Sequence, residues 1–401
     1  MNVLYLSHAA ALGGAELYLL DYLKYYGRGS KVLLFAEGAF AQSLRDVGAE
    51  VEVMAAPQKF LSVSREAKGY KSLGVASEVL AQARKVARAA ENFDVIFANS
   101  QKAFMVGALA ALMTRKQLVW CLHDILTAEH FSAANRKLVI SLANLTGALV
   151  VANSQATAAA FVQSGGRAAR VRVVYNGIDV AAYGPEAQAG GETLSRDLRE
   201  DLGIGDAPVV GVFSRLSAWK GQHVLLDALT RLPDVHALLV GDALFGEDAY
   251  AERLREQVQQ LGLAGRVHFL GFRRDVPELM RCADIIAHTS VSAEPFGRVV
   301  VEGMLSEKPV VATYAGAIPE IIRNGETGLM VEPGDAAALA AAIGRVLGDA
   351  EHAAALGAAG RRVALERFSL AAMANGLKHC FAELAYSADA GTFDEYEPRV
   401  A

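Results

Sequence analysis

Short apolar runs rich in β-branched residues alternate with longer amphipathic stretches, and this alternation occurs twice along the chain. Alternation of this kind predicts βαβ units and parallel sheets. The first half contains two clear helical patterns, at 14–26 and 39–48. Its expected strands are residues 2–7, 31–36, 50–54, 94–99, 118–123 and 148–153.

The strand pattern restarts after residues 183–197, a segment that is rich in Gly and Glu and lacks periodicity. A chain of 401 residues also exceeds the size at which one core stops growing, which favours two domains. We therefore expect an α/β fold of two Rossmann-like domains that face a central cleft, because parallel sheets bind ligands at the carboxyl ends of their strands. The expected strands of the second half are residues 208–214, 236–242, 266–272, 284–290 and 309–316.

The predicted boundaries are a first domain over 1–182, a linker over 183–197 and a second domain over 198–368. Residues 369–387 form a helical segment that is expected to cross back onto the first domain, and 388–401 form an acidic tail.

Charge differs between the two halves. Residues 1–180 hold 19 Lys and Arg against 13 Asp and Glu, whereas the remainder holds 20 against 31. A basic first half and an acidic second half are expected to face different partners. The three cysteines are far apart, which argues against a disulfide framework and fits a reducing cytoplasm. The pattern at the amino terminus predicts a buried strand rather than a signal peptide. The longest apolar stretches are too short to span a bilayer.

Two glutamates in "EPFGRVVVE", Glu294 and Glu302, are separated by seven residues. If 297–306 is a helix, they lie roughly 12 Å apart, farther than the about 5–9.5 Å of glycosidase carboxylate pairs. Such a span fits a ligand with hydroxyls at both ends and an anionic middle near the helix start, as in a nucleotide sugar. The alternative has equal weight on spacing alone: Glu294 caps the helix and Glu302 is a solvated surface residue.

Two cations follow the strand that ends at Ser214. Arg215 and Lys220 lie in the turn before an amphipathic helix, and cations at the carboxyl end of a strand suit phosphates. As an isolated pair they would be ordinary surface cations. In the first half, His123 and Asp124 end another strand, where a histidine can bind a substrate hydroxyl or serve a structural role.

The loop after the first strand, "SHAAALGGAELY", contains Gly13 and Gly14 but lacks the G-x-G-x-x-G spacing of a dinucleotide site. Its glycines allow close backbone approach to a sugar or phosphate, or serve a tight turn. No D-x-D triplet or H-E-x-x-H motif occurs, so we expect no metal site. A diphosphate leaving group would then depend on Arg215, Lys220 and helix-end amides.

A basic segment with interleaved apolar residues, "PQKFLSVSREAKGYKSLG", suits an anionic membrane surface or a lipid-phosphate acceptor. A solvated loop and helix is the alternative, with somewhat more weight locally. The cations of this segment are Lys59, Arg65, Lys68 and Lys71.

Taken together, these motifs resemble retaining glycosyltransferase family 4, whose members have the GT-B fold. The resemblance covers nearly the whole chain, and "EPFGRVVVE" is its strongest match. The segments "RLSAWKG", "VVYNGID" and "AGAIPEIIRNGETGLMVEPGD" are also similar to family segments, as are "GGAE" and the "HD" pair. Two positions depart from the pattern: Ser214 replaces a common Gly, and "AGAIPE" replaces a Gly-Gly pair. Neither departure removes a charged residue.

The resemblance implies roles for particular residues. Arg215 and Lys220 would hold the donor diphosphate, and Glu302 would hold the ribose. Glu294 would contact hydroxyls of the transferred sugar, and His123 would lie near its 6-hydroxyl. The implied catalytic set is thus His123, Arg215, Lys220 and Glu294. The remaining donor-binding positions are Gly14 near the phosphates, Leu270 and Phe272 at the base, amides around Phe296, Gly297 and Arg298, and Ser214, Gly241 and Val299.

We therefore expect a metal-independent, retaining transfer of a hexose from a nucleotide diphosphate sugar, UDP-glucose first and GDP-mannose next. The donor is a co-substrate, and no cofactor, metal or nucleic acid is expected. The acceptor would be a saccharide or lipid-linked saccharide of a bacterial envelope or exopolysaccharide, and the enzyme would be cytoplasmic and peripheral to the membrane. Two other classes stay open: a sugar-nucleotide-binding protein without turnover, and a nicotinamide-dependent dehydrogenase, which the missing glycine fingerprint disfavours.

Overall fold

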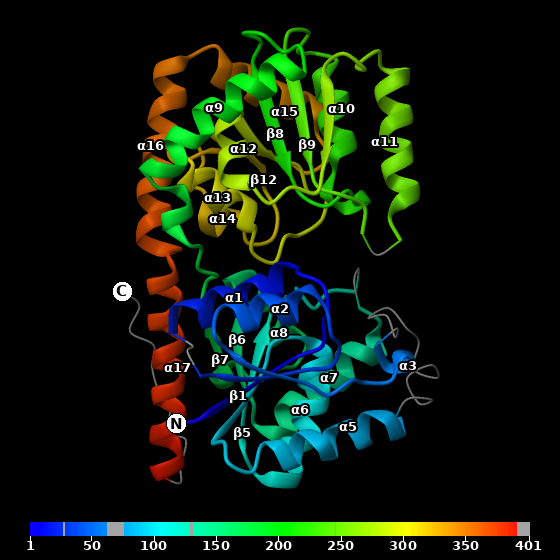
Figure 1. Ribbon diagram of the computed structural model, residues 1–401, viewed down its shortest axis with the longest axis vertical. Helices are drawn as coiled ribbons and strands as arrows, with labels where there is room; N and C mark the ends of the chain where they lie inside the picture. Colours follow the sequence, from blue (N-terminus) through cyan, green and yellow to red (C-terminus); the bar gives the residue numbers. More distant parts are fainter. Residues whose placement is uncertain (27–28, 62–75, 129–130, 245, 391–401) are drawn as a thin grey trace. The chain divides into compact units, whose positions relative to one another are not determined.

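The structure is a computed structural model that describes the chain except for residues 27–28, 62–75, 129–130, 245 and 391–401 (Figure 1). At 185–190 and 387–390 only the backbone is described. The chain divides into two compact units, which we call the first unit (Met1–Gly177 with Leu370–Ala401) and the second unit (Ile178–Ser369).

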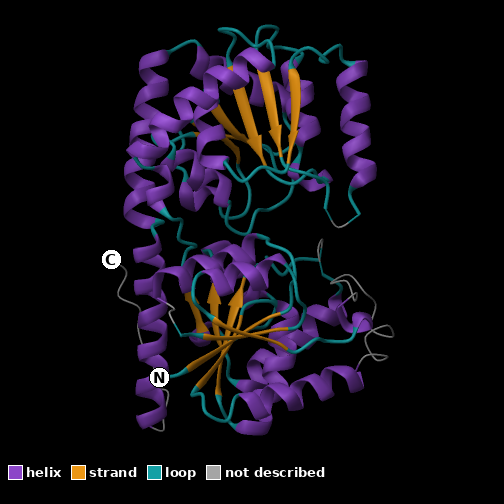
Figure 2. Ribbon diagram, viewed as in Figure 1, coloured by secondary structure: helices purple, strands orange, loops and turns teal. Residues whose placement is uncertain are grey.

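A seven-stranded parallel sheet forms the centre of the first unit, in the order β3-β2-β1-β4-β5-β6-β7 (Figure 2). All six predicted strands are present. The edge strand β7, which the sequence analysis missed, has three residues and too few side chains for a periodicity to be recognised. In chain order the strands are β1 (Val3–Ser7), β2 (Lys31–Leu34), β3 (Glu50–Val53), β4 (Val95–Ala98), β5 (Gln117–Leu122), β6 (Leu149–Ala152) and β7 (Val171–Val173).

Both faces of this sheet are covered by helices, which is why its central strands are continuously apolar. Successive strand residues point to opposite faces, so Leu4 and Tyr5 enter different cores. On one face Phe104 stacks on Trp120, with ring centroids 4.1 Å apart. The described helices are α1 (Gly14–Tyr26), α2 (Ala39–Asp46), α3 (Gln58–Leu61), α5 (Ala76–Ala89), α6 (Gln101–Thr114), α7 (Ala133–Thr146), α8 (Gln155–Gln163) and α17 (Leu370–Ala390), with a 3-10 turn η1 (Ala168–Arg170).

The C-terminal helix α17 belongs to the first unit, as the sequence analysis predicted, and lies beside α1 (Figure 1). Arg172 of β7 makes a two-point contact with Glu383, with Nη2 2.5 Å from Oε1 and Nε 2.9 Å from Oε2. Gln117 donates to the carbonyl of Leu384 at 2.9 Å. The predicted acidic tail lies outside the described residues from 391 onward, and α17 continues to Ala390.

The second unit has a six-stranded parallel sheet in the order β10-β9-β8-β11-β12-β13. Its five predicted strands are present, and the three-residue edge strand β13 was not predicted. The strands are β8 (Val209–Phe213), β9 (His236–Val240), β10 (Val267–Gly271), β11 (Ile285–His288), β12 (Val310–Thr313) and β13 (Leu329–Val331). The helices are α9 (Pro185–Asp201), α10 (Gln222–Leu229), α11 (Asp248–Gln260), α12 (Val276–Cys282), α13 (Arg298–Leu305), α14 (Ile318–Ile321), α15 (Ala336–Leu347) and α16 (Ala350–Arg367), with 3-10 turns η2 (Val180–Tyr183) and η3 (Ala218–Lys220).

The expected linker over 183–197 is wrong, because most of it is the first part of helix α9. Pro185 occupies the first turn, where its missing N–H and fixed φ are favourable. The helix packs tightly: a Cβ on Gly191 would lie 2.6 Å from Cδ of Arg281 in α12. Two adjacent glycines and few apolar residues hid this helix from the sequence pattern, since Gly in a helix interior is normally unfavourable.

None of the described helices combines the length and apolarity that a membrane crossing requires. The apolar stretch within 103–113 lies in α6, whose inward face packs in the core of the first unit. All three cysteines are free and buried, as expected for a chain without a disulfide framework.

Candidate functional site in the second unit

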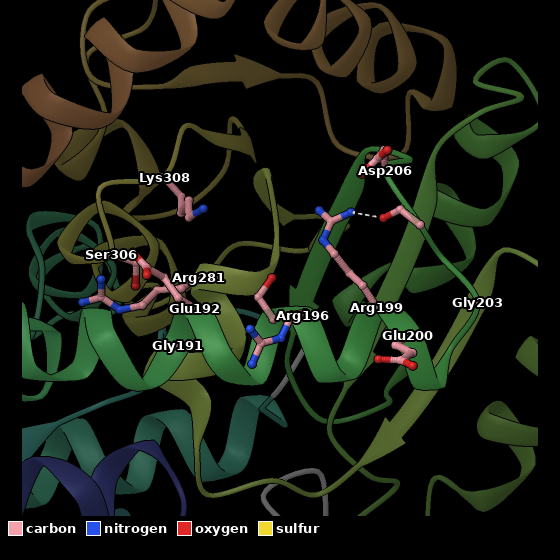
Figure 3. A pocket seen from close by; sticks show the side chains of 12 residues that line it. Gly191, Glu192, Arg196, Arg199, Glu200, Gly203, Asp206, Arg281, Ser306 and Lys308 are labelled. Carbon is pink, nitrogen blue, oxygen red and sulfur yellow. Dashed lines mark hydrogen bonds between the residues drawn. The ribbon is translucent and has the colours of Figure 1, made fainter.

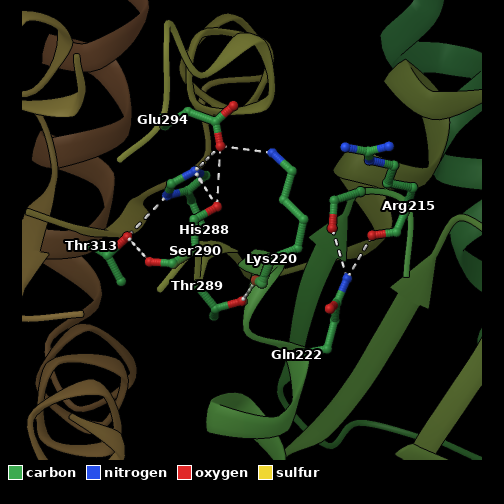
Figure 4. Close-up of polar contacts among 9 residues, drawn as sticks. Arg215, Lys220, Gln222, His288, Thr289, Ser290, Glu294 and Thr313 are labelled. Carbon is green, nitrogen blue, oxygen red and sulfur yellow. Dashed lines mark hydrogen bonds and ion pairs between the residues drawn. The ribbon is translucent and has the colours of Figure 1, made fainter. Parts of the chain in front are cut away.

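The strand order of the second sheet reverses between β8 and β11, which lie side by side. Crossovers run away from such a switch point in both directions, which leaves room for a ligand at the carboxyl ends of the two strands. Ser214 directly follows β8 and His288 ends β11, while Lys220 and Glu294 lie in the segments that follow them (Figure 4). The sequence-predicted residues of the second unit therefore gather at the edge where α/β sheets bind ligands.

Lys220 and Glu294 form an ion pair, with Nζ 2.7 Å from Oε2 (Figure 4). Their side chains are only 14% and 11% exposed. Burial alone would raise the pKa of Glu294, but the Lys220 ammonium and the His288 ring outweigh it and hold the pKa of Glu294 well below its usual range. The structure thus brings together the two residues that the resemblance assigned to the phosphate and the sugar, and it keeps the carboxylate charged.

A buried polar cluster behind Glu294 escaped the sequence analysis. His288 Nε2 lies 3.2 Å from Glu294 Oε2, and Ser290 Oγ donates to the same oxygen at 3.1 Å. On the other side of the ring, Thr313 Oγ1 lies 3.4 Å from His288 Nδ1 and donates to the carbonyl of Ser290 at 2.8 Å. The only signal in the sequence is a polar triplet, "HTS", at the end of an otherwise apolar strand.

Two glycines shape the backbone around the ion pair. Gly316 has a φ of +60°, and a Cβ there would lie 2.2 Å from the Glu294 carbonyl oxygen. Gly221 has a φ of +69°, and its Cβ would lie 2.0 Å from the carbonyl oxygen of Thr289. Only glycine fits these positive-φ contacts. The departure "AGAIPE" therefore retains Gly316, which the close approach of this loop to the Glu294 carbonyl requires.

Gln222 organises the turn that carries the cations. Its Nε2 donates to Ser214 Oγ and to the carbonyl of Arg215, each at 2.9 Å (Figure 4). Trp219 lies beside both cations: Lys220 Nζ is 4.1 Å from its ring centroid and the Arg215 guanidinium carbon is 5.7 Å away. These cation–π contacts restrain both side chains, in addition to the ion pair of Lys220 with Glu294.

The helix after Glu294 begins as predicted, with Gly297 as its N-cap and Arg298 as its first residue. Phe296 is buried, and Val299 lies in the first turn. Glu302 lies one turn further along and faces Arg298, with Oε1 3.6 Å from Nε. The N-cap of this helix is Gly297, and Glu294 lies before it in a buried ion pair with Lys220. The alternative interpretation, in which Glu294 only caps the helix, therefore does not apply.

The predicted base-edge positions lie at the same edge of the sheet. Gly241 follows β9, and its N–H donates to the carbonyl of Gly271 at the end of β10. Leu270 is half-buried, while the ring of Phe272 is 67% exposed. An exposed aromatic ring directly after β10 is available to stack on a planar group.

A separate cavity of about 960 Å³ opens beside α9 (Figure 3). Its residues Asp206 and Lys308 precede β8 and β12, so it lies at the amino ends of the strands. Its charged residues are of both signs, and Arg199 already contacts Asp284 at 3.2 Å. We therefore place the candidate site at the carboxyl edge, where the buried ion pair lies.

Candidate functional residues in the first unit

His123 follows β5 at the carboxyl edge of the first sheet. Its Nε2 lies 3.0 Å from Asn99 Oδ1, and its ring packs against the Tyr18 ring in a T-shaped arrangement. Asn99 is fully buried and donates through Nδ2 to the carbonyl of Ala15, which leaves its oxygen to accept from His123. Burial lowers the pKa of His123 to about 4, partly opposed by Asp124. His123 is therefore neutral near pH 7, with its proton on Nε2.

Gly14 begins α1, and Glu16 in the first turn is buried. Burial raises the pKa of Glu16 to about 7. The backbone N–H groups of Glu16 and Gly13 oppose this rise, and the Asp124 carboxylate adds to it. The "GGAE" segment thus combines a helix start with a carboxyl that titrates near neutrality.

We expect Glu16 and His123 to oppose each other in the pH dependence of stability. Glu16 has a raised pKa, so its contribution is complete below about pH 4.5 and is lost as pH rises to about 7. His123 has a lowered pKa, so its contribution is complete above about pH 6.5 and is lost as pH falls to about 4. Between these limits, each group changes the free energy of unfolding by about 1.4 kcal/mol per pH unit. The free energy of unfolding of Glu16→Gln, minus that of the parent, should therefore increase as pH rises from 4.5 to 6.5. The same difference for His123→Asn should decrease over that range.

Urea unfolding followed by tryptophan fluorescence can measure this. The chain has two tryptophans, and Trp120 lies in the core of the first unit. In a Trp219→Phe background the signal reports on the first unit alone. If the free energy of unfolding of each variant changed with pH in the same way as that of the parent, the expected contributions of Glu16 and His123 would be contradicted.

The predicted acceptor or membrane segment is described only in part. Lys59 is exposed in the short helix α3. Arg65, Lys68 and Lys71 lie outside the described residues. Among the residues that are described, no group of three His, Cys, Asp or Glu side chains could hold a metal ion.

Comparison with known proteins

Two family models match consecutive parts of the chain. Glycosyltransferase Family 4 matches residues 12–182, and Glycosyl transferases group 1 matches residues 195–363. The solved structure of Anabaena HepE in complex with UDP and glucose is 42% identical, covers 95% of this chain and 99% of that one, and superposes with a TM-score of 0.84. Another structure of HepE contains UDP-glucose.

Curated relatives match over shorter regions. A lipopolysaccharide core biosynthesis glycosyltransferase, LpsE of Rhizobium meliloti, is 36% identical over 41% of this chain and 46% of its own length. A GDP-mannose-dependent α-(1-6)-phosphatidylinositol monomannoside mannosyltransferase of Mycolicibacterium smegmatis is 33% identical over 54% of this chain and 57% of its own length. The chain spans about half the length of the curated relatives it matches.

HepE and this chain align over nearly their full lengths, and the two family models lie on the first and second units in turn. The two parallel sheets and the returning C-terminal helix are those expected of the GT-B fold. The chain belongs to the GT-B glycosyltransferases that combine a Glycosyltransferase Family 4 domain with a Glycosyl transferases group 1 domain.

Proposed function

We propose that the protein transfers a hexose from a UDP-sugar to a hydroxyl of a saccharide or lipid-linked saccharide, with retention of anomeric configuration and without a metal ion. The observation that carries this proposal is the buried Lys220–Glu294 pair at the switch point of the second sheet. It puts a cation that can bind a phosphate beside a carboxylate that stays charged and can accept hydrogen bonds from sugar hydroxyls. The 42% identity to a protein crystallised with UDP-glucose supports the choice of donor.

In the proposed reaction, Arg215, Lys220 and the amides at the start of α13 bind the diphosphate and stabilise its charge as it leaves. The bond between the sugar C1 and the diphosphate oxygen breaks, and a bond between C1 and the acceptor oxygen forms on the same face. The acceptor proton passes to the leaving diphosphate, so no carboxylate needs to act as a base. Glu302 is proposed to bind the ribose and Phe272 to contact the base. Neutral His123 is proposed to bind the 6-hydroxyl of the sugar.

GDP-mannose is the second donor candidate, supported by the mycobacterial mannosyltransferase relative. The proposed acceptor class is supported by the similarity to a relative that is named for lipopolysaccharide core biosynthesis. Action at the cytoplasmic face of a membrane, through the basic segment at 59–71, stays a prediction.

The test combines donor binding with turnover. Thermal unfolding is measured with UDP-glucose, UDP-galactose, GDP-mannose and ADP-glucose, because a ligand that binds the folded state raises the apparent stability. Release of the nucleoside diphosphate is then assayed with EDTA present, with a panel of saccharide and lipid-linked acceptors. We expect the largest shift and release with a UDP-hexose, unchanged by EDTA. Binding without release from any donor would favour a non-catalytic sugar-nucleotide-binding protein, and the absence of any shift would contradict the proposal.

A further inference from the structure

The carboxylate of Glu294 is held through one oxygen only. Oε2 receives three partners: Lys220 Nζ at 2.7 Å, Ser290 Oγ at 3.1 Å and His288 Nε2 at 3.2 Å. Figure 4 shows these three contacts converging on one oxygen, while the other oxygen points away from them. No partner of Oε1 is found among the described residues, nor is Oε1 among their buried polar atoms without a hydrogen bond. Oε1 is therefore open to a ligand.

His288 is itself fixed on both sides. The Thr313 hydroxyl gives its proton to the carbonyl of Ser290, so its oxygen is left to accept from His288 Nδ1. His288, Ser290 and Thr313 are 3%, 1% and 2% exposed, which leaves the ring no room to turn and no water to replace its partners. A buried network whose members are all hydrogen-bonded is rigid. His288 ends β11, Ser290 follows that strand, and Thr313 ends the neighbouring strand β12.

Lys220 differs from the other two partners of Oε2. Under the proposed function it also binds the donor diphosphate, so its contact with Glu294 is shared with the ligand. His288 and Ser290 are buried and remain on Oε2 whether or not a donor is bound. The orientation of Glu294 in the loaded site therefore depends on them.

We propose that His288 is a positioning residue that, with Ser290, pins Oε2 of Glu294 so that Oε1 meets a hydroxyl of the transferred hexose. This inference rests on the proposed function for the identity of the ligand. His288 touches no substrate; it acts through Glu294. The site therefore offers the sugar one oriented carboxylate oxygen, and donor sugars are discriminated by whether a hydroxyl reaches that oxygen.

Two substitutions separate the two nitrogens of His288. Glutamine places an amide N–H near the position of Nε2, whereas asparagine reaches only the position of Nδ1. We expect His288→Gln to keep kcat/KM for the UDP-hexose within about threefold of the parent. We expect His288→Asn to lower it about 10–100-fold, the effect of one charge-assisted hydrogen bond. The Kd for UDP should change less than about twofold in both variants, because UDP lacks the sugar.

Equal kcat/KM in the parent and both variants would overturn the inference. So would parallel loss of UDP binding and UDP-hexose turnover in both variants, because that pattern indicates a merely structural histidine. A stability double-mutant cycle with Glu294→Gln tests the contact without any turnover: coupling to Glu294 should survive in His288→Gln and vanish in His288→Asn. If the parent shows the coupling energy but no turnover, the proposed function is refuted and the contact between His288 and Glu294 is still supported. If the parent turns over the UDP-hexose but shows no coupling energy, the positioning role is refuted.

Discussion

Lys220→Ala is expected to lower kcat/KM for the nucleotide sugar about 10²–10³-fold, as loss of one preorganised group on a developing anion does in other enzymes. The same substitution leaves the buried Glu294 carboxylate without its closest cation. Removal of one partner of a buried ion pair costs about 3–5 kcal/mol, and the contact of Glu294 with His288 should reduce that cost. Steady-state release of the nucleoside diphosphate and urea unfolding measure the two effects.

The stability loss in Lys220→Ala should depend on pH in a defined direction. Glu294 has a lowered pKa in the folded parent, so its stabilising contribution is present above about pH 4.5 and is lost as pH falls below that value. The difference between parent and variant should therefore be largest near pH 7 and shrink toward pH 3. Arg231→Ala, which removes an exposed cation of the same unit, serves as the control and should change neither quantity. A variant with normal turnover, or a loss of stability that grows on acidification, would contradict the role of the pair.

Much of the fold could be predicted because its signals are local. A parallel strand that is buried on both faces is continuously apolar, and the central predicted strands are such runs, as in Val95–Ala98. The edge strand β3 instead alternates Glu and Val. The position of the charged residues followed from the same reasoning, since Arg215 and Lys220 had to lie at the carboxyl end of the strand before them. The elements that escaped prediction are those whose stability comes from packing, namely the edge strands β7 and β13 and the glycine-containing helix α9.

The contacts within the site were harder to predict than its location. Lys220 and Glu294 are 74 residues apart, and Thr313 reaches His288 from the next strand. Such pairs depend on strand order, which the sequence of one chain does not give. His288 was passed over for a further reason, because a histidine ending an apolar strand has no helical or metal-ligand spacing to mark it. The sequence therefore pointed to the charged residues that are proposed to bind the ligand, and it did not point to the buried residues that contact Glu294.

The roles of Glu294 and Glu302 can be distinguished by mutation, because each is proposed to bind a different part of the donor. Glu294→Gln keeps the size of the side chain and removes the charge that Lys220 and His288 face. We expect kcat/KM for the UDP-hexose to fall about 10²–10³-fold, since the sugar hydroxyl loses its charged acceptor. The Kd for UDP alone should change less than about threefold, because UDP has no sugar to present to Oε1.

Glu302→Gln is the matched variant, one turn into α13 and paired with Arg298 at 3.6 Å. If Glu302 binds the ribose, its substitution should weaken UDP and UDP-hexose alike, each about tenfold, the value of one charge-assisted hydrogen bond. Calorimetry with UDP and the UDP-hexose, combined with turnover, distinguishes the two patterns. The reverse result, in which Glu294→Gln weakens UDP and Glu302→Gln acts only on the sugar, would mean that the donor lies in the opposite direction along this segment. Only this measurement assigns the sugar and the ribose to their glutamates. The spacing of Glu294 and Glu302 cannot do so, because it is the same for either direction of the donor.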